Sequence, residues 1–358
     1  SGAAIAGLSA QSFLAAEENA NETIAESIKA FCIDFNWDKP HLAKPGRWAD
    51  ADPKEHIKWY KELGCNIVQT FCVSCNGYAW YKGGVVPEQP DLKHDFLTDM
   101  VNLGHKEKMK VFGYYCVGAN SRWQKEHPEE NYAQRDLHVP LTNKYLDYLG
   151  SAIEDAVKKT GIDGFMIDWL WNPPKDGWLK CEQEMYVELM NEKFPGVDKV
   201  SKESTLEYRR RSIDRCWKRI YETAKSVSPN ILIWLSCSKP DHNEIAGSSL
   251  FQQVDWFMNE AGDIERLKKT IPIVGKQTRL LTCLAAWNRQ DPKNIINKIT
   301  ESKLDIGLYG FTMPTQNTLP PPIQTYLTKP IDTFKGDEKN IAVFARIYNK
   351  LPLDYVQK

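Results

Sequence analysis

Eight short apolar runs, separated by segments with helical patterning, constrain the fold of this 358-residue chain more than any other feature. Each run is a nearly continuous hydrophobic stretch, which is typical of parallel strands covered on both faces. The runs lie at residues 30–37, 66–73, 110–117, 164–168, 231–236, 254–258, 279–285 and 306–312. Eight strand–helix units within about 330 residues predict an α/β fold, a TIM (β/α)8 barrel.

Helix signals fill the segments between the runs. Asp52 is placed to cap a helix whose first residue is Pro53, Glu55 completes a capping box, and Gly64 ends it. A second helix is expected over 144–159, with Asn143 as its N-cap. Further helices are expected over 92–107, 203–226 and 338–350, and the last of them would close the ring.

A doubly wound open sheet is the alternative fold. Such a sheet usually carries a glycine-rich phosphate loop after its first strand, and the sequence contains neither G-x-G-x-x-G nor G-x-x-x-x-G-K. No fixed-length repeat or low-complexity linker divides the chain, so residues 27–358 are predicted to form one catalytic domain. Residues 173–200 are predicted to be an insertion after the fourth strand, with a short helix of its own, that closes the pocket.

The first 26 residues differ in composition from the rest of the chain. Residues 2–16 are small and apolar, and a polar acidic segment follows them. This pattern resembles the end of a secretory signal and predicts export, to a bacterial periplasm or the extracellular space. It is too short and too weakly apolar to span a membrane. A disordered leader on a cytosolic protein is the alternative, which the many single cysteines favour.

Charge and aromatic content narrow the class of ligand. The formal net charge is −1, so nothing favours nucleic acid or an anionic membrane surface. Twelve tryptophans supply flat apolar faces with one N–H donor each, which suit stacking on sugar rings. The composition therefore favours a glycan as the binding partner.

The nine cysteines are interpreted mainly as small buried hydrophobes. Those in or beside predicted strands are Cys32, Cys72, Cys75, Cys116, Cys237 and Cys283. Cys72 and Cys75 form a C-x-x-C, but no second pair stands at zinc-ligand spacing. No metal site and no organic cofactor are predicted.

Catalytic groups of such barrels gather where strands end and loops begin. Tryptophans and side-chain amides recur at these positions, as expected of a surface that stacks on sugars and reads their hydroxyls. The predicted substrate-binding residues are Asp34, Asn36, Trp37, Asn76, Tyr78, Trp80, Asn120, Arg122, Trp123, Trp169, Trp171, Trp287 and Asn288.

Asp168 ends the fourth run, in "GFMID". Because side chains alternate along a strand, Phe165 and Ile167 should face the helices, whereas Met166 and Asp168 point into the barrel. An inward carboxylate in an aromatic pocket is costly without a role, so Asp168 is a candidate catalytic group. The alternative is an Asp that caps the next turn or pairs with a buried Arg.

Glycoside hydrolysis usually needs a second carboxyl group as proton donor. Glu260 is the first candidate, because it follows "VDWFMN" and apolar neighbours would raise its pKa. Asp263 is better placed to cap the next helix. Glu244 and Asp241, after the fifth run, are the reserve acids.

The segments "FCIDFNWD", "GYAW", "DFLTDMVNLGHKEKMKVFGYYCVGANSRW" and "GFMIDW" resemble the strands and helices of the α-L-fucosidase family of glycoside hydrolases. The resemblance covers roughly residues 28–172. It implies a barrel, a retaining reaction, Asp168 as nucleophile and Trp37 as a pocket wall.

Two motifs of that family differ here. The His-Trp pair of strand one is Asn36-Trp37, and the His-His-Asp-Gly-Phe of strand two aligns with residues 74–78, "SCNGY". The histidines that bind fucose in that family are absent here. The resemblance therefore implies the fold and the reaction class rather than the identity of the sugar.

These features together predict a retaining exo-glycoside hydrolase, α-L-fucosidase-like, that cleaves terminal sugars from glycans. One alternative is a carbohydrate-binding barrel without catalytic activity. The other is a metal-dependent barrel hydrolase, which would need clustered histidines at strand ends, where only His242 lies.

Overall fold

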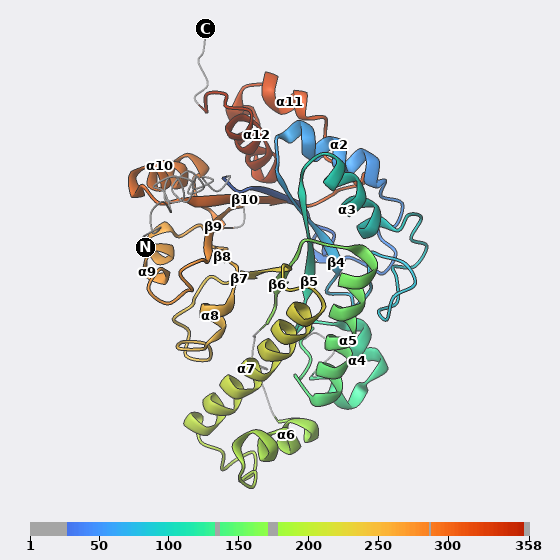
Figure 1. Cartoon of the computed structure of the whole chain (residues 1–358), viewed down its shortest axis with the longest axis vertical. Coiled ribbons are helices and arrows are strands. Elements are labelled where there is room, and N and C mark those ends of the chain that lie inside the picture. Colours follow the sequence, from blue (N-terminus) through green and yellow to red (C-terminus); the bar gives the residue numbers. More distant parts are fainter. Residues whose placement is uncertain (1–26, 133–136, 171–177, 286–287, 354–358) are drawn as a thin grey trace, which may run out of the picture.

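The computed structural model describes residues 27–132, 137–170, 178–285 and 288–353. Eight parallel strands form a closed barrel in the order β1-β10-β9-β8-β7-β6-β5-β4 (Figure 1). They are β1 (Lys29–Ile33), β4 (Ile67–Val73), β5 (Lys110–Cys116), β6 (Gly164–Asp168), β7 (Leu232–Ser236), β8 (Trp256–Asn259), β9 (Arg279–Leu284) and β10 (Ile306–Thr312). The predicted (β/α)8 barrel is confirmed, and the doubly wound alternative is wrong.

Helices surround the barrel (Figure 1). They are α2 (Pro53–Leu63), α3 (Phe96–Lys106), α4 (Ser121–Glu126), α5 (Asn143–Thr160), α6 (Lys180–Met190), α7 (Lys202–Val227), α8 (Leu250–Gln253), α9 (Ile264–Thr270), α10 (Pro292–Ser302), α11 (Ile323–Thr328) and α12 (Gly336–Tyr348). The short elements are β2 (Trp37–Asp38) and β3 (His41–Leu42), which pair antiparallel after β1, and the 3-10 turns η1 (Pro128–Glu130) and η3 (Ile331–Thr333). Among the described helices, none has the length and apolar character needed to cross a membrane.

Local sequence signals explain where the helices begin and end. The Asp52 carboxylate accepts a hydrogen bond from Lys54 N, Pro53 opens α2, and Gly64 ends it with a left-handed φ of 96°. Thr142, rather than the predicted Asn143, caps α5, because its hydroxyl accepts from Tyr145 N. Asn143 is the first helical residue, and its amide reaches Glu188.

A layer of aromatic rings fills the lower part of the barrel. Phe112 of β5 lies 4.5 Å from the ring of Trp256 and 5.7 Å from that of Trp234, centroid to centroid. Gly164 of β6 makes room for this layer, since a Cβ there would lie 2.5 Å from the Phe112 ring. This layer makes the lower part of the barrel a packed core rather than a pore.

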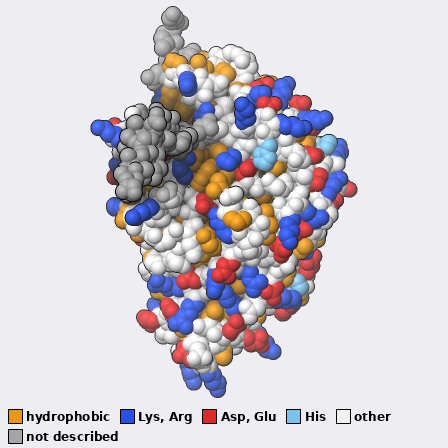
Figure 2. Space-filling view, in the orientation of Figure 1, with side chains coloured by type: hydrophobic (Ala, Val, Ile, Leu, Met, Phe, Trp, Pro, Cys, Tyr) orange, Lys and Arg blue, Asp and Glu red, His pale blue; other side chains and the backbone are white. Residues whose placement is uncertain are grey.

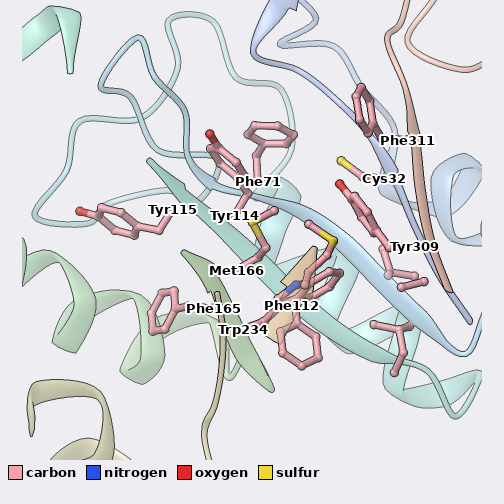
Figure 3. Packing of buried hydrophobic residues seen from close by; sticks show 14 of the residues in the cluster. Cys32, Phe71, Phe112, Tyr114, Tyr115, Phe165, Met166, Trp234, Tyr309 and Phe311 are labelled. Atoms are coloured by element: carbon pink, nitrogen blue, oxygen red, sulfur yellow. The ribbon is translucent and has the colours of Figure 1, made fainter. Parts of the chain in front are cut away.

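The alternation predicted for β6 is confirmed. Met166 and Asp168 line the space inside the barrel, while Phe165 lies on the opposite face of the sheet beside Tyr115, with ring centroids 6.1 Å apart (Figure 3).

The predicted insertion carries its own helix, α6, which packs beside the end of α7 that projects from the barrel (Figure 1). Trp178, Tyr186, Phe194 and Tyr208 form an aromatic cluster that holds the two helices together. Residues 173–177 lie outside the described part of the chain.

Candidate active site

Two cavities meet at the carboxyl ends of the barrel strands. The first, the axial cavity, has a volume of about 390 Å³ and lies along the barrel interior. Its lining is Cys32, Asp34, Asn36, Trp37, Lys39, Pro40, Gln69, Phe71, Tyr114, Met166, Asp168, Trp169, Glu260, Tyr309, Phe311 and Met313. Figure 3 shows five of these residues, which come from four strands: Phe71 from β4, Tyr114 from β5, Met166 from β6, and Tyr309 and Phe311 from β10.

The second, the lateral cavity, has a volume of about 360 Å³ and lies over the ends of β6, β7 and β8. Its lining is Asp168, Trp169, Leu170, Ser236, Cys237, Ser238, Lys239, His242 and Glu260. Asp168, Trp169 and Glu260 line both cavities, so they form the boundary between them. The face of the molecule seen in Figure 2 is hollowed near its centre, where hydrophobic side chains gather.

The Asp168 carboxylate is held by two donors. The hydroxyl of Tyr114, on the neighbouring strand β5, donates to Oδ2 at 2.8 Å, and the backbone N–H of Trp169 donates to Oδ1 at 3.0 Å. Burial raises the pKa of Asp168 above its ordinary value, and both hydrogen bonds oppose that rise because they favour the charged form. The site therefore combines desolvation with two fixed donors on one carboxylate.

The turn after Asp168 is a strained one. Trp169 has a φ of 56°, a left-handed conformation that a bulky residue rarely adopts. The strand end is tied to the end of β5, because Val117 N donates to Asp168 O at 3.0 Å and Gly118 N donates to Trp169 O at 2.8 Å. These backbone contacts fix both the carboxylate and the indole that follows it.

Glu260 follows β8 directly and faces Asp168 across the boundary. The Ser236 hydroxyl donates to its Oε2 at 2.9 Å. Burial raises the pKa of Glu260 to about 8, and the negative charge of Asp168 adds to this rise. Burial and the charge of Asp168 act in the same direction on Glu260, so its pKa lies above neutral pH.

A third carboxyl group, that of Asp34, lies in the axial cavity. Burial raises its pKa to about 7, and the hydrogen bond that Oδ1 accepts from Asn36 N, at 2.7 Å, acts in the opposite direction. Asp34 follows the last residue of β1, below Asn36, as the sequence indicates.

The sequence-predicted residues separate into three groups. Asp34, Asn36, Trp37, Asp168, Trp169 and Glu260 come together around the axial cavity. Trp171 and Trp287 lie outside the described residues. Asn76, Tyr78, Trp80, Asn120, Arg122, Trp123 and Asn288 are absent from the described lining of both cavities.

Local contacts explain why the amides of the third group do not face a sugar. Asn76 exchanges two hydrogen bonds with Gln89, at 3.2 and 3.1 Å. Asn120 caps α4 by accepting from Trp123 N at 2.9 Å. The Asn288 amide donates to the carbonyl of Cys283, at the end of β9. Each amide therefore supports a loop.

The larger side chains of the third group also serve packing. Trp80 is buried, stacks on Phe35 at 4.4 Å between centroids and donates to Ser74. Trp123 packs 5.0 Å from the Tyr145 ring and donates to Glu130.

Arg122 donates to Gly77 O at 2.9 Å and to the Tyr148 hydroxyl at 2.8 Å, and it pairs with Glu126. Its guanidinium lies 5.9 Å from the Tyr78 ring. These contacts build the loops after β4 and β5, and neither Arg122 nor Tyr78 is among the described residues that line the two cavities.

The reserve acids occupy other positions. Asp263 caps α9 by accepting from Arg266 N, as the sequence predicts. Glu244 is buried and pairs with Arg209 at 3.1 Å. Asp241 is exposed and lies 3.8 Å from Arg266. Of these carboxylates and Glu260, Glu260 is the one that lines the cavities with Asp168.

Of the two hydroxyl donors to the carboxylates, sequence reasoning missed Tyr114, and it placed Ser236 at the end of the fifth strand without giving it a role. Tyr114 could have been found from the alternation that places Asp168 inside the barrel, because Phe112, which faces the interior, is two residues before it on β5. Ser236 is the last residue of β7, next to the β8 strand that precedes Glu260.

The cysteines in or beside strands are buried and form no disulfide, as predicted. Within the described ranges, no group of three or more His, Cys, Asp or Glu side chains could hold a metal ion.

The comparisons with known proteins agree with this architecture. Residues 50–169 match the family model described as "Hypothetical glycosyl hydrolase 6". A search of curated proteins by sequence finds no match.

Solved structures of low sequence identity share the fold. Alpha-L-fucosidase isoenzyme 2 from Paenibacillus thiaminolyticus superimposes with a TM-score of 0.63 at 13% identity over 91% of this chain and 49% of that chain. The PgaB (BpsB) glycoside hydrolase domain from Bordetella bronchiseptica gives 0.56 at 11% identity, over 80% and 93% of the two chains. The alpha-amylase from Geobacillus thermoleovorans gives 0.51 at 13% identity, over 90% and 79%.

The chain thus spans about half the length of the fucosidase it matches. The resemblance to α-L-fucosidase barrels is confirmed at the level of the fold. The chain is thus a (β/α)8 barrel, part of which is similar to a glycosyl hydrolase family model, and its structural neighbours share that fold.

Proposed function

We propose that this chain is a retaining exo-glycoside hydrolase, with Asp168 as nucleophile and Glu260 as acid and base. The observation that carries the proposal is the pairing of two buried carboxyl groups with unequal support for their charged forms. Burial raises the pKa of both groups, but Asp168 accepts two hydrogen bonds that favour its charge. Glu260 accepts one from Ser236, and burial together with the charge of Asp168 raises its pKa to about 8. Such a split is how one site supplies a base and an acid at neutral pH.

The reaction proceeds in two balanced steps. In the first, an Asp168 oxygen attacks the anomeric carbon, the bond from that carbon to the leaving oxygen breaks, and the leaving oxygen takes the proton of Glu260. In the second, water attacks the same carbon, its proton passes to Glu260, and the ester to Asp168 breaks. Both groups return to their starting state, and the sugar leaves with its original anomeric configuration.

The axial cavity supports a sugar of limited size as the group that is transferred. Its lining residue Tyr309 packs on Trp234 of the aromatic layer, with ring centroids 5.1 Å apart, and Trp37, Trp169 and Phe311 give it apolar walls. Asp34 and Asn36 supply polar groups for hydroxyls. A blind pocket of this kind favours release of a terminal sugar, and the resemblance to the fucosidase family makes an α-L-fucosyl group the first sugar to test.

The first experiment measures hydrolysis of aryl α- and β-glycosides of fucose, galactose, rhamnose and arabinose. We expect one glycoside to be cleaved, and Asp168→Asn to lower kcat by about a thousandfold or more. Glu265→Gln is a matched control, because that carboxylate is exposed and pairs with Lys268. Asp241→Asn tests the reserve acid and should leave turnover near the wild-type rate.

Rescue by azide distinguishes the nucleophile from the acid and base. With Asp168→Gly, azide should take the place of the lost nucleophile and give a glycosyl azide of inverted configuration. With Glu260→Ala, azide should attack the covalent intermediate and give a glycosyl azide of retained configuration. Proton NMR of the products distinguishes the two. Glycan binding without turnover by any variant would instead favour the non-catalytic carbohydrate-binding protein.

Export through the first 26 residues is a separate proposal, supported by their composition alone. Expressing the chain in a bacterium with and without residues 1–26 and comparing its level in the periplasmic fraction tests this proposal, and equal levels in the two cases would reject it.

A further inference from the structure

The boundary formed by Asp168 and Glu260 has a cavity on each side, and the proposed reaction uses only the axial one. A glycoside has two parts, the sugar that is transferred and the group that leaves. The proposed mechanism requires the nucleophile to face the first part and the acid to face the oxygen of the second. The two cavities, of about 390 and 360 Å³, therefore raise the question of which part each one holds.

The hydrogen-bond donors to the two carboxyl groups answer this question. Tyr114, which donates to Asp168, lines the axial cavity and is absent from the described lining of the lateral cavity. Ser236, which donates to Glu260, shows the reverse pattern. The nucleophile is thus anchored on the axial side and the acid on the lateral side. The leaving oxygen must then lie toward the lateral cavity.

The chemistry of the lateral cavity points to the kind of leaving group. Ser236 and Ser238 contribute hydroxyls, Lys239 an ammonium and His242 an imidazole, all from the end of β7 and the loop after it. Lys239 is exposed and forms no ion pair with any described residue. The His242 ring is partly exposed. These are donors for hydroxyl and ring oxygens, which an alkyl or aryl group does not offer.

The two carboxylates of this loop pair with basic side chains. Asp241 lies 3.8 Å from Arg266, and Glu244 pairs with Arg209 and also lies 4.0 Å from His242 Nδ1. Neither carboxylate is among the described residues that line the lateral cavity. Lys239 is therefore the cationic side chain that remains for a ligand within the described lining.

We propose that the lateral cavity is a leaving-group subsite that binds a sugar residue through Ser238, Lys239 and His242. This inference rests on the proposed glycosidase activity and specifies its substrate class. The substrate is a saccharide on both sides of the cleaved bond.

The test uses two substrates with the same transferred sugar and different leaving groups. For a fucosyl group, these are para-nitrophenyl α-L-fucoside and the disaccharide α-L-fucosyl-galactose. If wild type cleaves another sugar of the aryl panel, the pair is built on that sugar. The measured quantity is the ratio of kcat/KM for the disaccharide to kcat/KM for the aryl glycoside.

We expect Lys239→Ala and His242→Ala each to lower this ratio about tenfold, because the lost contacts are made to the leaving sugar. Lys276→Ala is the matched control, since Lys276 is an exposed lysine before β9, at the opposite end of the barrel, and the ratio should not move. Circular dichroism confirms that each variant folds.

The possible outcomes distinguish a failure of the leaving-group subsite from a failure of the glycosidase proposal on which it rests. Cleavage of both substrates with an unchanged ratio in both loop variants overturns the leaving-group subsite and leaves the glycosidase proposal standing. Cleavage of neither substrate by wild type, across the panel, overturns both. A fall of the ratio in the loop variants and not in Lys276→Ala supports the subsite.

Discussion

At the residue scale, the hydroxyl of Tyr114 is the feature that most directly sets the state of the proposed nucleophile. It donates to Asp168 at 2.8 Å, and its own pKa is raised well above the ordinary value by burial and by the charge of Asp168, so it remains a donor over the working pH range. The Phe71 ring, 4.8 Å away between centroids, fixes the phenol from the other side.

Tyr114→Phe removes this donor and keeps the ring. Because the hydrogen bond favours the charged carboxylate, its loss raises the pKa of Asp168, and the acidic limb of the kcat/KM profile should move up by about one pH unit. At pH values below the acidic limb, kcat/KM of the variant should be about tenfold lower than that of wild type. Tyr115→Phe is the control, since the neighbouring hydroxyl is buried on the other face of the strand and has no hydrogen-bond partner among the described residues. An unmoved acidic limb in Tyr114→Phe would remove the assigned role.

Ser236 should influence the alkaline limb of the kcat/KM profile, which depends on the pKa of Glu260. Its hydroxyl lowers the pKa of Glu260, which burial holds at about 8, and the acid works only while protonated. Activity should therefore fall as the pH rises above about 8. In Ser236→Ala the pKa of Glu260 rises further and the alkaline limb should move to higher pH, measured with a substrate whose leaving group needs protonation. A downward move of that limb would show that Glu260 is not the group that titrates there.

At the element scale, the joined ends of β5 and β6 hold the nucleophile in place. Gly118 approaches the Asp168–Trp169 turn so closely that a Cβ at this position would lie 2.3 Å from Trp169 O. Backbone cannot give way as a flexible side chain can, so any added atom must displace the turn.

Gly118→Ala should therefore lower kcat by at least about tenfold, since small displacements of a reacting group are costly. Gly150→Ala is the matched control. Gly150 lies inside α5, where a Cβ would meet the flexible side chain of Arg219 at 3.2 Å, and alanine favours the helix. Comparable losses in the two variants, at equal folded fractions by circular dichroism, would argue against a special role for the β5–β6 junction.

At the element scale, the strands show how much of the fold could be predicted from the sequence. The expected strand ranges agree with the observed ones to within two residues, because a strand buried on both faces leaves a continuous apolar run that polar loops interrupt. The exception is the first run, residues 30–37, which continues four residues beyond the end of β1 at Ile33. The last two runs illustrate this agreement. Residues 279–285 and 306–312 were predicted as strands, and the observed strands are Arg279–Leu284 and Ile306–Thr312. The carboxylate of Asp168 followed from the two-residue period alone.

The loop residues could not be predicted in the same way. Asn120 has the amide that reads sugar hydroxyls, but the same amide caps a helix, and it does so here. Thr142 and Asn143 are both good caps, and only the observed path of the chain selects Thr142. Which polar group at a strand end reaches the cavity depends on loop geometry, which the sequence does not encode in a simple period.

At the scale of the whole molecule, the closed barrel brings together carboxyl groups that are far apart in the chain. α12 packs on β10, and the Tyr348 hydroxyl lies 3.1 Å from the carbonyl oxygens of both Ala30 and Leu308, where β1 meets β10. This contact supports the pair of strands at which the first and last units of the barrel join. The barrel interior then desolvates Asp34, Asp168 and Glu260 together.

Burying these acids should make the stability of the fold depend on pH. The pKa of Glu260 is about 8 in the folded chain and near the ordinary value of 4.5 once unfolded. Between those values the folded state holds a proton that the unfolded state has released. The contribution of Glu260 to the free energy of unfolding is therefore greatest below about pH 4.5 and decreases until about pH 8.

Glu260→Gln removes this dependence, because glutamine is neutral at every pH and can still accept from Ser236. Its melting temperature should exceed that of wild type by a few degrees at pH 9, and the difference should shrink toward zero at pH 4. Thermal unfolding at matched ionic strength across this range measures it, with Glu265→Gln as the exposed control. A Glu260→Gln variant that is no more stable than wild type at pH 9 would mean that the carboxylate is already compensated in the folded barrel. It could then not remain protonated at neutral pH as the proposed acid must.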